Sequence, residues 1–139
     1  MKKSVSVFSG LALTAVLASG CVIDADSPSQ VGTLTVLWTV DNTTDPAACD
    51  FYARDPFLGM DFEFLIYDVS DILVAEAQAD CADFGLSLRL DRGLYNATAT
   101  MVDPITDDAL STSLPLDRVE IFRRTETTLD IDFPPSSFP

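Results

Sequence analysis

The chain's three cysteines are the residues whose types most restrict the chemistry it can do. Cys21 stands near the N-terminus, and Cys49 and Cys81 lie further along the 139-residue chain. A redox centre would need a close Cys-x-x-Cys pair, which is absent, and a zinc site needs more than two such soft ligands. In an oxidising compartment an odd number of cysteines leaves one thiol over after pairing. One of the three is therefore expected to have a separate role.

Acidic residues are the second group with possible chemistry, and Ca²⁺ is the ion that their oxygens could bind. The segment Asp41-Asn42-Thr43-Thr44-Asp45 begins like an EF-hand loop, but Pro46 replaces the required Gly and Tyr52 replaces the bidentate Glu. Oxygens from separate loops could still gather at one end of the molecule. The candidates are Asp41, Asp45, Asp103, Asp107 and Asp108. Solvated turn residues are the simpler interpretation, and under it the protein has no cofactor.

Most residues that commonly perform catalysis are missing. There is no histidine, and the only lysines are Lys2 and Lys3. A Gly-x-Ser-x-Gly nucleophile turn and a Gly-rich phosphate loop are also absent. The 22 acidic residues leave a carboxylate pair for glycoside hydrolysis open by composition, but a small β domain offers no evident deep cleft for it. We expect that the protein is not an enzyme.

The N-terminal segment has the organisation of a secretory signal peptide. Lys2 and Lys3 precede an uncharged stretch over residues 5–18, and the small residues Ser19 and Gly20 follow it. The apolar run is shorter than the ~20 residues that a membrane-spanning helix requires. We therefore expect residues 1–20 to be removed and the rest of the chain to be exported.

The residues Ala18-Ser19-Gly20-Cys21 resemble the lipobox of bacterial lipoproteins, in which the cysteine thiol is diacylated and becomes the first mature residue. Leu17 stands one place before the usual leucine position, and an ordinary signal peptidase could cut the same bond. The resemblance implies that Cys21 carries lipid, and two acyl chains suffice for stable anchoring. Cys49 and Cys81 then remain to form a structural disulfide, worth about 3–4 kcal/mol for a loop of this length.

The mature chain is expected to be short and strongly acidic. Removing residues 1–20 leaves 119 residues, which suits one domain with one core, and changes the net charge from −14 to −16. Such a surface disfavours nucleic acid and anionic lipid headgroups as partners, and solubility is its simplest role. Residues 21–31, with the lipidated Cys21, are predicted to form a polar tether that reaches at most ~35 Å. Residues 32–139 are predicted to form the domain.

The domain consists of short segments in which apolar and polar residues alternate, the period of a half-buried β-strand. In the first segment Leu34, Val36, Trp38 and Val40 share one face. The predicted strands cover residues 34–40, 61–67, 73–80, 84–90, 95–101, 110–116 and 127–133, with a further extended piece at 119–122 and a loop at 41–55. The alanines of segment 73–80 would also permit a helix. Pro115 marks its strand as an edge or an end.

About seven short strands with no convincing helix predict an all-β fold, an antiparallel β-sandwich. The residues Leu90-Asp91-Arg92-Gly93-Leu94-Tyr95 resemble the Leu-x-x-Gly-x-Tyr segment of immunoglobulin-like, transthyretin-like and carboxypeptidase-regulatory-like sandwiches, in which the Tyr opens a core strand. With the lipobox and the cysteine pair, the whole chain resembles small bacterial lipoproteins built from one such domain. This resemblance lends no catalytic residues.

Location and the missing catalytic residues together indicate a binding or accessory module of a bacterial cell envelope. Its membrane contact would be the lipid on Cys21, and its partner another envelope protein or a glycan. By resemblance to enterobacterial sorting, Val22 after the cysteine, where Asp would retain a lipoprotein, favours the outer membrane over the inner. The alternative function is that of a structural, Ca²⁺-stabilised envelope domain without a specific ligand site.

Overall fold

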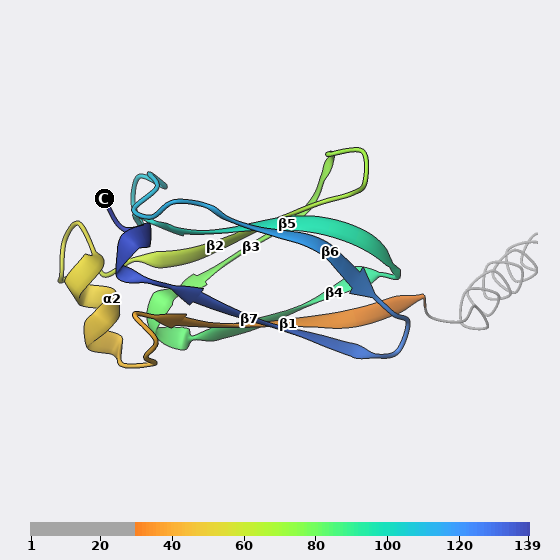
Figure 1. Cartoon of the computed structure of the whole chain (residues 1–139), viewed down its shortest axis with the longest axis horizontal. Coiled ribbons are helices and arrows are strands. Elements are labelled where there is room, and N and C mark those ends of the chain that lie inside the picture. The colour runs from red at the N-terminus through yellow and green to blue at the C-terminus, as the bar shows by residue number, and fades with distance from the viewer. Residues whose placement is uncertain (1–29) are drawn as a thin grey trace, which may run out of the picture.

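The computed structural model describes residues 30–139, so the predicted signal peptide, Cys21 and most of the tether lie outside the described residues. Two β-sheets face each other (Figure 1). One has three strands in the order β4-β1-β7, and the other has four in the order β3-β2-β5-β6. The strands are β1 (Val31–Val40), β2 (Asp61–Tyr67), β3 (Leu73–Asp80), β4 (Gly85–Asp91), β5 (Gly93–Val102), β6 (Leu114–Ile121) and β7 (Glu126–Phe133). The predicted seven-stranded β-sandwich is confirmed.

The core lies between the sheets and follows the predicted alternation. From β1, Leu34, Val36, Trp38 and Val40 are buried, and from β2 the inward residues Phe62, Phe64 and Ile66 face them from the other sheet. Trp38 stacks on Phe62 with ring centroids 3.9 Å apart. The Trp38 Nε1–H donates a hydrogen bond of 2.8 Å to the carbonyl oxygen of Cys81. Burying this indole therefore leaves no polar atom unpaired.

One strand pair differs from the expected antiparallel arrangement. β1 pairs with β4 antiparallel but with β7 parallel, and the other strand pairs are antiparallel. Since β1 and β7 both begin at the same end of the sandwich, they can only run side by side in the same direction. The order also differs from an immunoglobulin constant domain, in which the first strand shares a sheet with the second, fifth and fourth.

The predicted loop over residues 41–55 contains a helix, α2 (Pro46–Tyr52), which corrects the expectation of no helix. Asp45 is its N-cap and accepts a hydrogen bond from the Ala47 N–H, while Pro46 occupies the first turn. An Asp-Pro pair suits both a turn and a helix start, which is why the sequence pattern was ambiguous here. Seven residues do not form a stable helix alone, so α2 depends on its tertiary contacts.

The segment between residues 110 and 122 also differs from its prediction. Instead of strands at 110–116 and 119–122, there is one strand, β6, and residues 110–113 precede it. These residues bond elsewhere: the Leu110 N–H donates to the Met101 carbonyl, and the Thr112 N–H donates to the Ser137 carbonyl. β6 lies at the edge of its sheet, so the prediction from Pro115 is confirmed.

The turn between β4 and β5 passes from one sheet to the other. Tyr95 closes this turn, because its hydroxyl donates a 2.7 Å hydrogen bond to the Asp91 carbonyl. This is the geometry of a tyrosine corner, in which the Tyr near the start of a core strand bonds back to the preceding backbone. The Leu-x-x-Gly-x-Tyr segment therefore has the structural role that its sequence suggested.

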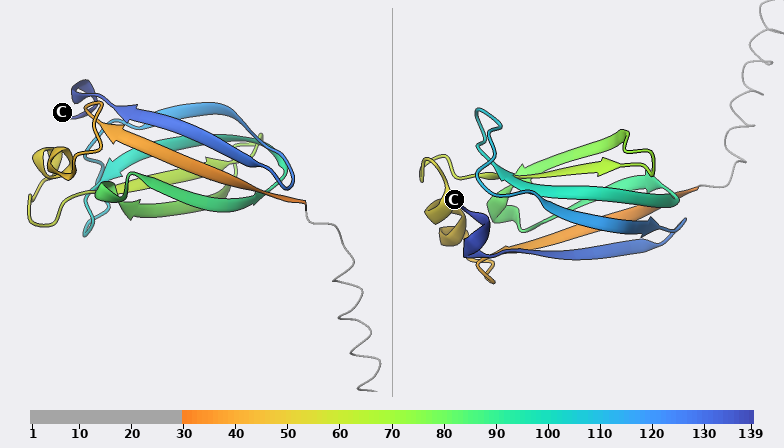
Figure 2. Two further views of the ribbon diagram at one scale, coloured as in Figure 1. Left: turned by 90° about the horizontal axis from the view of Figure 1, so that it is seen from below. Right: turned by 45° about the horizontal axis from the view of Figure 1, so that its top comes forward.

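The sandwich has two different ends (Figures 1 and 2). The tether end comprises the start of β1 and the turns at residues 91–93 and 122–125. The distal end comprises α2, the loop at residues 103–113 and the C-terminus. Residues 1–29 precede the tether end in the chain. Among residues 30–139, no helix has the length and apolar character needed to cross a membrane.

Candidate functional site

The predicted disulfide joins Cys49 and Cys81 and is confirmed, with Cα atoms 6.0 Å apart. Cys49 lies on α2, and Cys81 begins the short 3₁₀ helix η1 (Cys81–Asp83) that follows β3. Both cysteines are buried in the core. A second contact holds α2 in place, because Tyr52 stacks on Phe138 with ring centroids 4.1 Å apart. The two contacts fix a short helix on the distal end of the sandwich.

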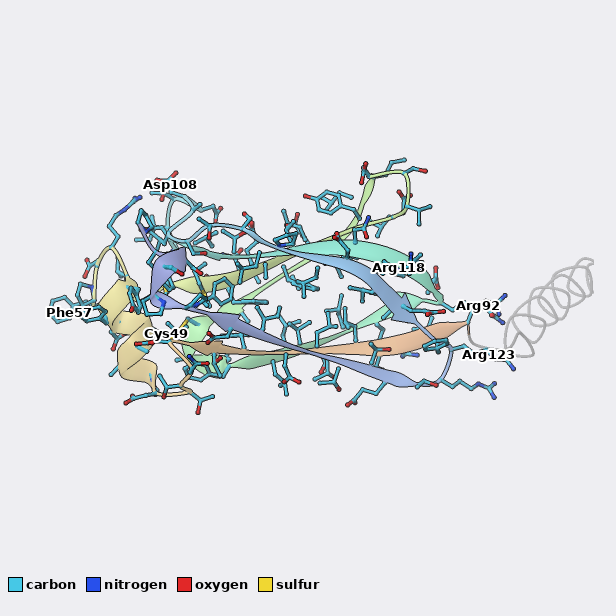
Figure 3. The ribbon with its side chains drawn as sticks, viewed as in Figure 1. Cys49, Phe57, Arg92, Asp108, Arg118 and Arg123 are labelled. Atoms are coloured by element: carbon cyan, nitrogen blue, oxygen red, sulfur yellow. A yellow bond between two sulfur atoms is a disulfide. The ribbon has the colours of Figure 1, made fainter. Side chains whose placement is uncertain are left out.

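Large apolar side chains lie exposed on and after this fixed helix. The exposed fractions are 78% for Phe51, 98% for Phe57 and 50% for Leu58. The loop that carries Phe57 is ordered by Asp55, whose Oδ1 accepts a 2.9 Å hydrogen bond from the Phe57 N–H. Gly59 ends the loop with a φ of +68°, a conformation that favours glycine. The loop therefore holds these side chains outward, with Phe57 at the extreme distal end in Figure 3.

Arg54 connects this loop to the loop at residues 103–113. Its guanidinium lies 3.2 Å from the Asp108 carboxylate and 3.7 Å from that of Asp103. Hydrogen bonds from the Ile105 and Thr106 N–H groups lower the pKa of Asp103, and the charge of Arg54 lowers it further. Ile105 on this second loop is 69% exposed. We call Phe51, Phe57, Leu58 and Ile105 together the distal tip.

The five candidate Ca²⁺ ligands are divided between two places. Asp41 follows β1 and Asp45 caps α2, whereas Asp103, Asp107 and Asp108 share the loop that Arg54 contacts. Asp103 and Asp108 face a guanidinium, and Asp107 accepts a long hydrogen bond of 3.4 Å from Gln78. Within the described part of the chain, no three Asp, Glu, Cys or His side chains are grouped so that they could hold a metal ion.

Acidic side chains also cover the outer face of the four-stranded sheet near the distal end. Partial burial, with the charges of nearby carboxylates, raises the pKa of Asp61 and that of Glu63. Asp107 contributes to both shifts. Gln78 donates a 3.0 Å hydrogen bond to Asp61 and partly offsets its shift. The carboxylates of this face therefore repel one another when all are ionised.

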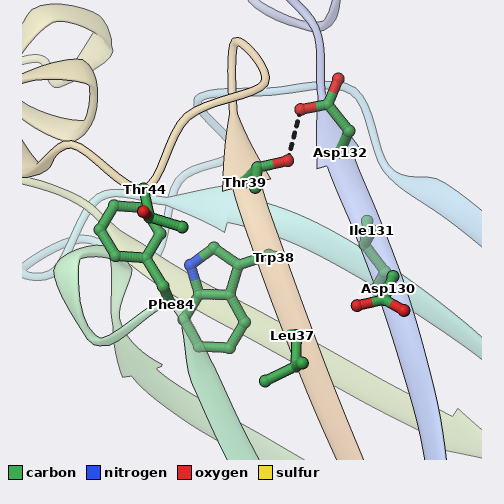
Figure 4. A pocket seen from close by; sticks show the side chains of 8 residues that line it. All are labelled: Leu37, Trp38, Thr39, Thr44, Phe84, Asp130, Ile131 and Asp132. Carbon is green, nitrogen blue, oxygen red and sulfur yellow. Dashed lines mark hydrogen bonds between the residues drawn. The ribbon is translucent and has the colours of Figure 1, made fainter.

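An open groove of about 420 Å³ lies on the three-stranded sheet near its distal end (Figure 4). Leu37 and Phe84 supply apolar surface, and Thr39, Thr44, Asp130 and Asp132 supply polar atoms. The Thr39 hydroxyl donates a 2.7 Å hydrogen bond to Asp132. Phe84 was predicted to point inward at the start of a strand, but it precedes β4 with a φ of 52° and is only half-buried. The groove was not predicted from the sequence.

The distal tip was also missed, although its sequence carries a signal. Asp55-Pro56-Phe57-Leu58-Gly59 is a turn-forming sequence that contains two large apolar residues. Apolar side chains in a turn have few core positions available to them, so this combination indicates exposure. Cys21, the predicted lipidation site, lies outside the described residues.

Comparison with known proteins found no family model, no curated protein and no solved structure that matches the chain. The function therefore has to be inferred from the residues of this chain and their arrangement.

Proposed function

We propose that the protein is a lipid-anchored module of a bacterial cell envelope that binds another envelope protein through its distal tip. The observation that carries the proposal is the set of exposed apolar side chains at the distal tip. Phe51 lies on the helix that the Cys49–Cys81 disulfide holds, and all four side chains lie at the end of the domain opposite the tether. The anchor would be lipid on Cys21, and the outer membrane remains the favoured location.

The distal tip has the composition of a protein interface. Phe51 and Phe57 are large aromatic residues, and such residues are enriched at interfaces and supply much of their binding energy. Asp45, Asp50 and Asp55 lie beside them in the chain and would form a polar rim. An exposed apolar cluster with a polar rim commonly marks a contact site. The complementary partner has an apolar centre with basic residues around it, because charges across an interface tend to be complementary.

The position of the tip supports the same function. β1 has ten residues and runs from the tether end to the distal end, a length of about 33 Å. A domain anchored at Cys21 would therefore present the distal tip away from the lipid, where another envelope protein can reach it.

The test is site-specific photo-crosslinking in the native host. A photoreactive phenylalanine analogue is placed at Phe57, and at Val69 as a control, since Val69 is also strongly exposed (71%) but lies on the β2–β3 hairpin. We expect one discrete adduct from position 57, lost when Leu58→Asp is added, and no such adduct from position 69. Identical adduct patterns at both positions would contradict the proposal.

A glycan is the second candidate ligand, and the groove is the observation that favours it. An apolar surface from Leu37 and Phe84 beside the acceptors of Asp130 and Asp132 resembles the lining of a small-molecule site. Binding to envelope polysaccharide should then be lost in Leu37→Asp and kept in Phe57→Ser. The opposite pattern would favour the distal tip.

The structural Ca²⁺ function finds no supporting contact among residues 30–139. Two of the candidate ligands, Asp103 and Asp108, already form ion pairs with Arg54.

A further inference from the structure

Arginine is distributed unevenly along the sandwich. Of the six arginines that follow the predicted signal peptide, Arg54 lies at the distal end, and within the described residues it is the one arginine with an ion pair. The others lie on strands or turns of the tether half: Arg89, Arg92, Arg118, Arg123 and Arg124. Figure 3 shows Arg92 and Arg123 beside the start of β1. Basic side chains therefore gather where the tether joins the domain.

Backbone hydrogen bonds fix two of these arginines against the first residues of the domain. The Arg92 N–H donates to the Gln30 carbonyl at 2.8 Å, and the Arg124 N–H donates to the Val31 carbonyl at 2.9 Å. Arg92 follows β4 and Arg124 precedes β7, the two neighbours of β1 in the sheet. The start of β1 therefore lies between two turns, each of which carries an arginine.

Exposed apolar side chains accompany the arginines. Phe122 is 53% exposed and Leu94 is 38% exposed, and both line one shallow hollow with Arg92 and Arg123. Gly32 allows the Phe122 turn to approach, because a Cβ there would lie 2.1 Å from the Phe122 carbonyl oxygen. Backbone packing therefore holds the Phe122 turn against the start of β1.

We infer that the tether end is a lipid-contacting surface, in which Arg92, Arg123 and Arg124 bind phospholipid phosphates while Phe122 and Leu94 enter the headgroup region. The occupant is the bilayer to which the chain is tethered, so the inference rests on the proposed anchoring. Arginine binds phosphate with paired N–H donors, and aromatic residues beside cations suit the membrane interface. A bilayer near Cys21 would be the surface nearest these side chains.

The charge of the whole molecule does not prevent this contact. The carboxylates of the tether half are Asp68, Asp71, Asp91, Asp117, Glu120 and Glu126, so the charges of this end, with its five arginines, nearly cancel and the large negative charge resides elsewhere. The distal end is separated from the tether end by the length of β1, about 33 Å, whereas the Debye length at physiological salt is about 8 Å. The negative charge of the distal end is therefore screened from a bilayer that touches the tether end, and an anionic bilayer would repel the distal end only if that end approached it. The sequence-based expectation that anionic headgroups are disfavoured describes the average surface and overlooks this end.

The test attaches the mature chain to vesicles chemically, so that it does not depend on lipidation in the cell. Every buried apolar residue of the core lies between Leu34 and Phe133, so the chain from Cys21 onward keeps the whole fold. Its Cys21 thiol is coupled to a maleimide phospholipid in vesicles of phosphatidylethanolamine and phosphatidylglycerol that contain brominated lipid. Phe122→Trp reports contact at the tether end, and Phe57→Trp is the matched control at the distal end. Trp38 is buried and gives the same background in both.

We expect quenching by brominated lipid to be about two- to fivefold stronger at position 122 than at position 57, since interfacial side chains lie ~5–10 Å into the headgroup boundary. Adding Arg123→Gln and Arg124→Gln to Phe122→Trp should lower this quenching, whereas adding Arg54→Gln should not. Equal quenching at positions 122 and 57, or quenching unaffected by the paired arginine changes, would overturn the inference. Crosslinking at Phe57 tests the distal tip independently, so either proposal can fail while the other stands.

Discussion

At the scale of single residues, the carboxylates of the distal half differ in what their charge does to the fold. The pKa of Asp61 is raised, so the folded state favours the protonated carboxyl over the ionised one. The contribution of Asp61 to the stability of the fold is therefore fully present below its unfolded pKa and is lost as pH rises through its folded pKa. We therefore expect Asp61→Asn to raise the melting temperature at pH 7 and to have little effect near pH 3. The Asn carbonyl can still accept the hydrogen bond from Gln78.

Asp103 is the matched control, because its pKa is shifted in the opposite direction to that of Asp61. Its pKa is lowered by the backbone hydrogen bonds from Ile105 and Thr106, so its stabilisation is present above the unfolded pKa and lost as pH falls. Asp103→Asn should lower the melting temperature at pH 7. Thermal melts of both variants across pH 3–8 would refute this account if the two changes had the same sign at neutral pH.

The hydroxyl of Tyr95 should also contribute to the stability of the fold. Burial and the nearby Asp91 charge raise the pKa of Tyr95, so the hydroxyl stays protonated and donates to the Asp91 carbonyl. Tyr95→Phe removes this hydrogen bond and should lower the free energy of unfolding by about 0.5–1.5 kcal/mol. Tyr67→Phe is the control, because the Tyr67 hydroxyl makes no hydrogen bond within residues 30–139. Equal losses in urea denaturation would show that the corner contributes nothing specific.

At the scale of elements, α2 depends on its connection to η1. The Cys49–Cys81 bridge spans 32 residues of sequence. Replacing both cysteines by alanine should therefore lower the free energy of unfolding by about 3–4 kcal/mol. Because a seven-residue helix is unstable alone, α2 should lose hydrogen-exchange protection before the sheets do. Cys21→Ala should leave both measurements unchanged. If α2 kept its hydrogen-exchange protection without the disulfide, the stacking of Tyr52 on Phe138 would be sufficient to hold the helix in place.

Strands were predictable from this sequence, whereas their partners were not. The alternation in β1, β2 and β7 identifies the buried face because side chains on a strand point alternately to opposite sides. That period carries no information on which strand lies next to which, so the parallel pairing of β1 with β7 could not be read from it. The helix α2 was missed for a local reason, since Asp45-Pro46 begins turns and helices equally well.

The two candidate surfaces required the fold for a different reason. Arg92 and Arg124 are far apart in the sequence, and they meet only because their turns bond to the start of β1. The turn-forming sequence around Phe57 indicates exposure, but only the fold shows that its loop lies at the end of the sandwich opposite the tether. The predicted disulfide was accessible because only two cysteines remained after Cys21 was assigned to lipid.

At the scale of the whole molecule, charge is separated along the long axis. Arginines gather at the tether end, whereas near the distal end partial burial and the charge of Asp107 raise the pKa of Asp61 and that of Glu63. Such separation gives the domain one end that tolerates an anionic surface and one that avoids it. Anchoring and partner binding would then occupy opposite ends, with the disulfide near the end that binds the partner.

Salt that only screens this charge and a cation that binds a specific site should affect the melting temperature differently. The net charge of the chain is −14, so added NaCl should raise the melting temperature by weakening repulsion between carboxylates. At constant ionic strength, CaCl₂ and MgCl₂ should give equal melting temperatures, and EDTA should change nothing, because the Arg54 guanidinium already contacts Asp103 and Asp108. Differential scanning calorimetry with each salt measures this. A saturable rise with Ca²⁺ alone would instead support a structural calcium site, since specific binding to the folded state stabilises it in proportion to ligand occupancy.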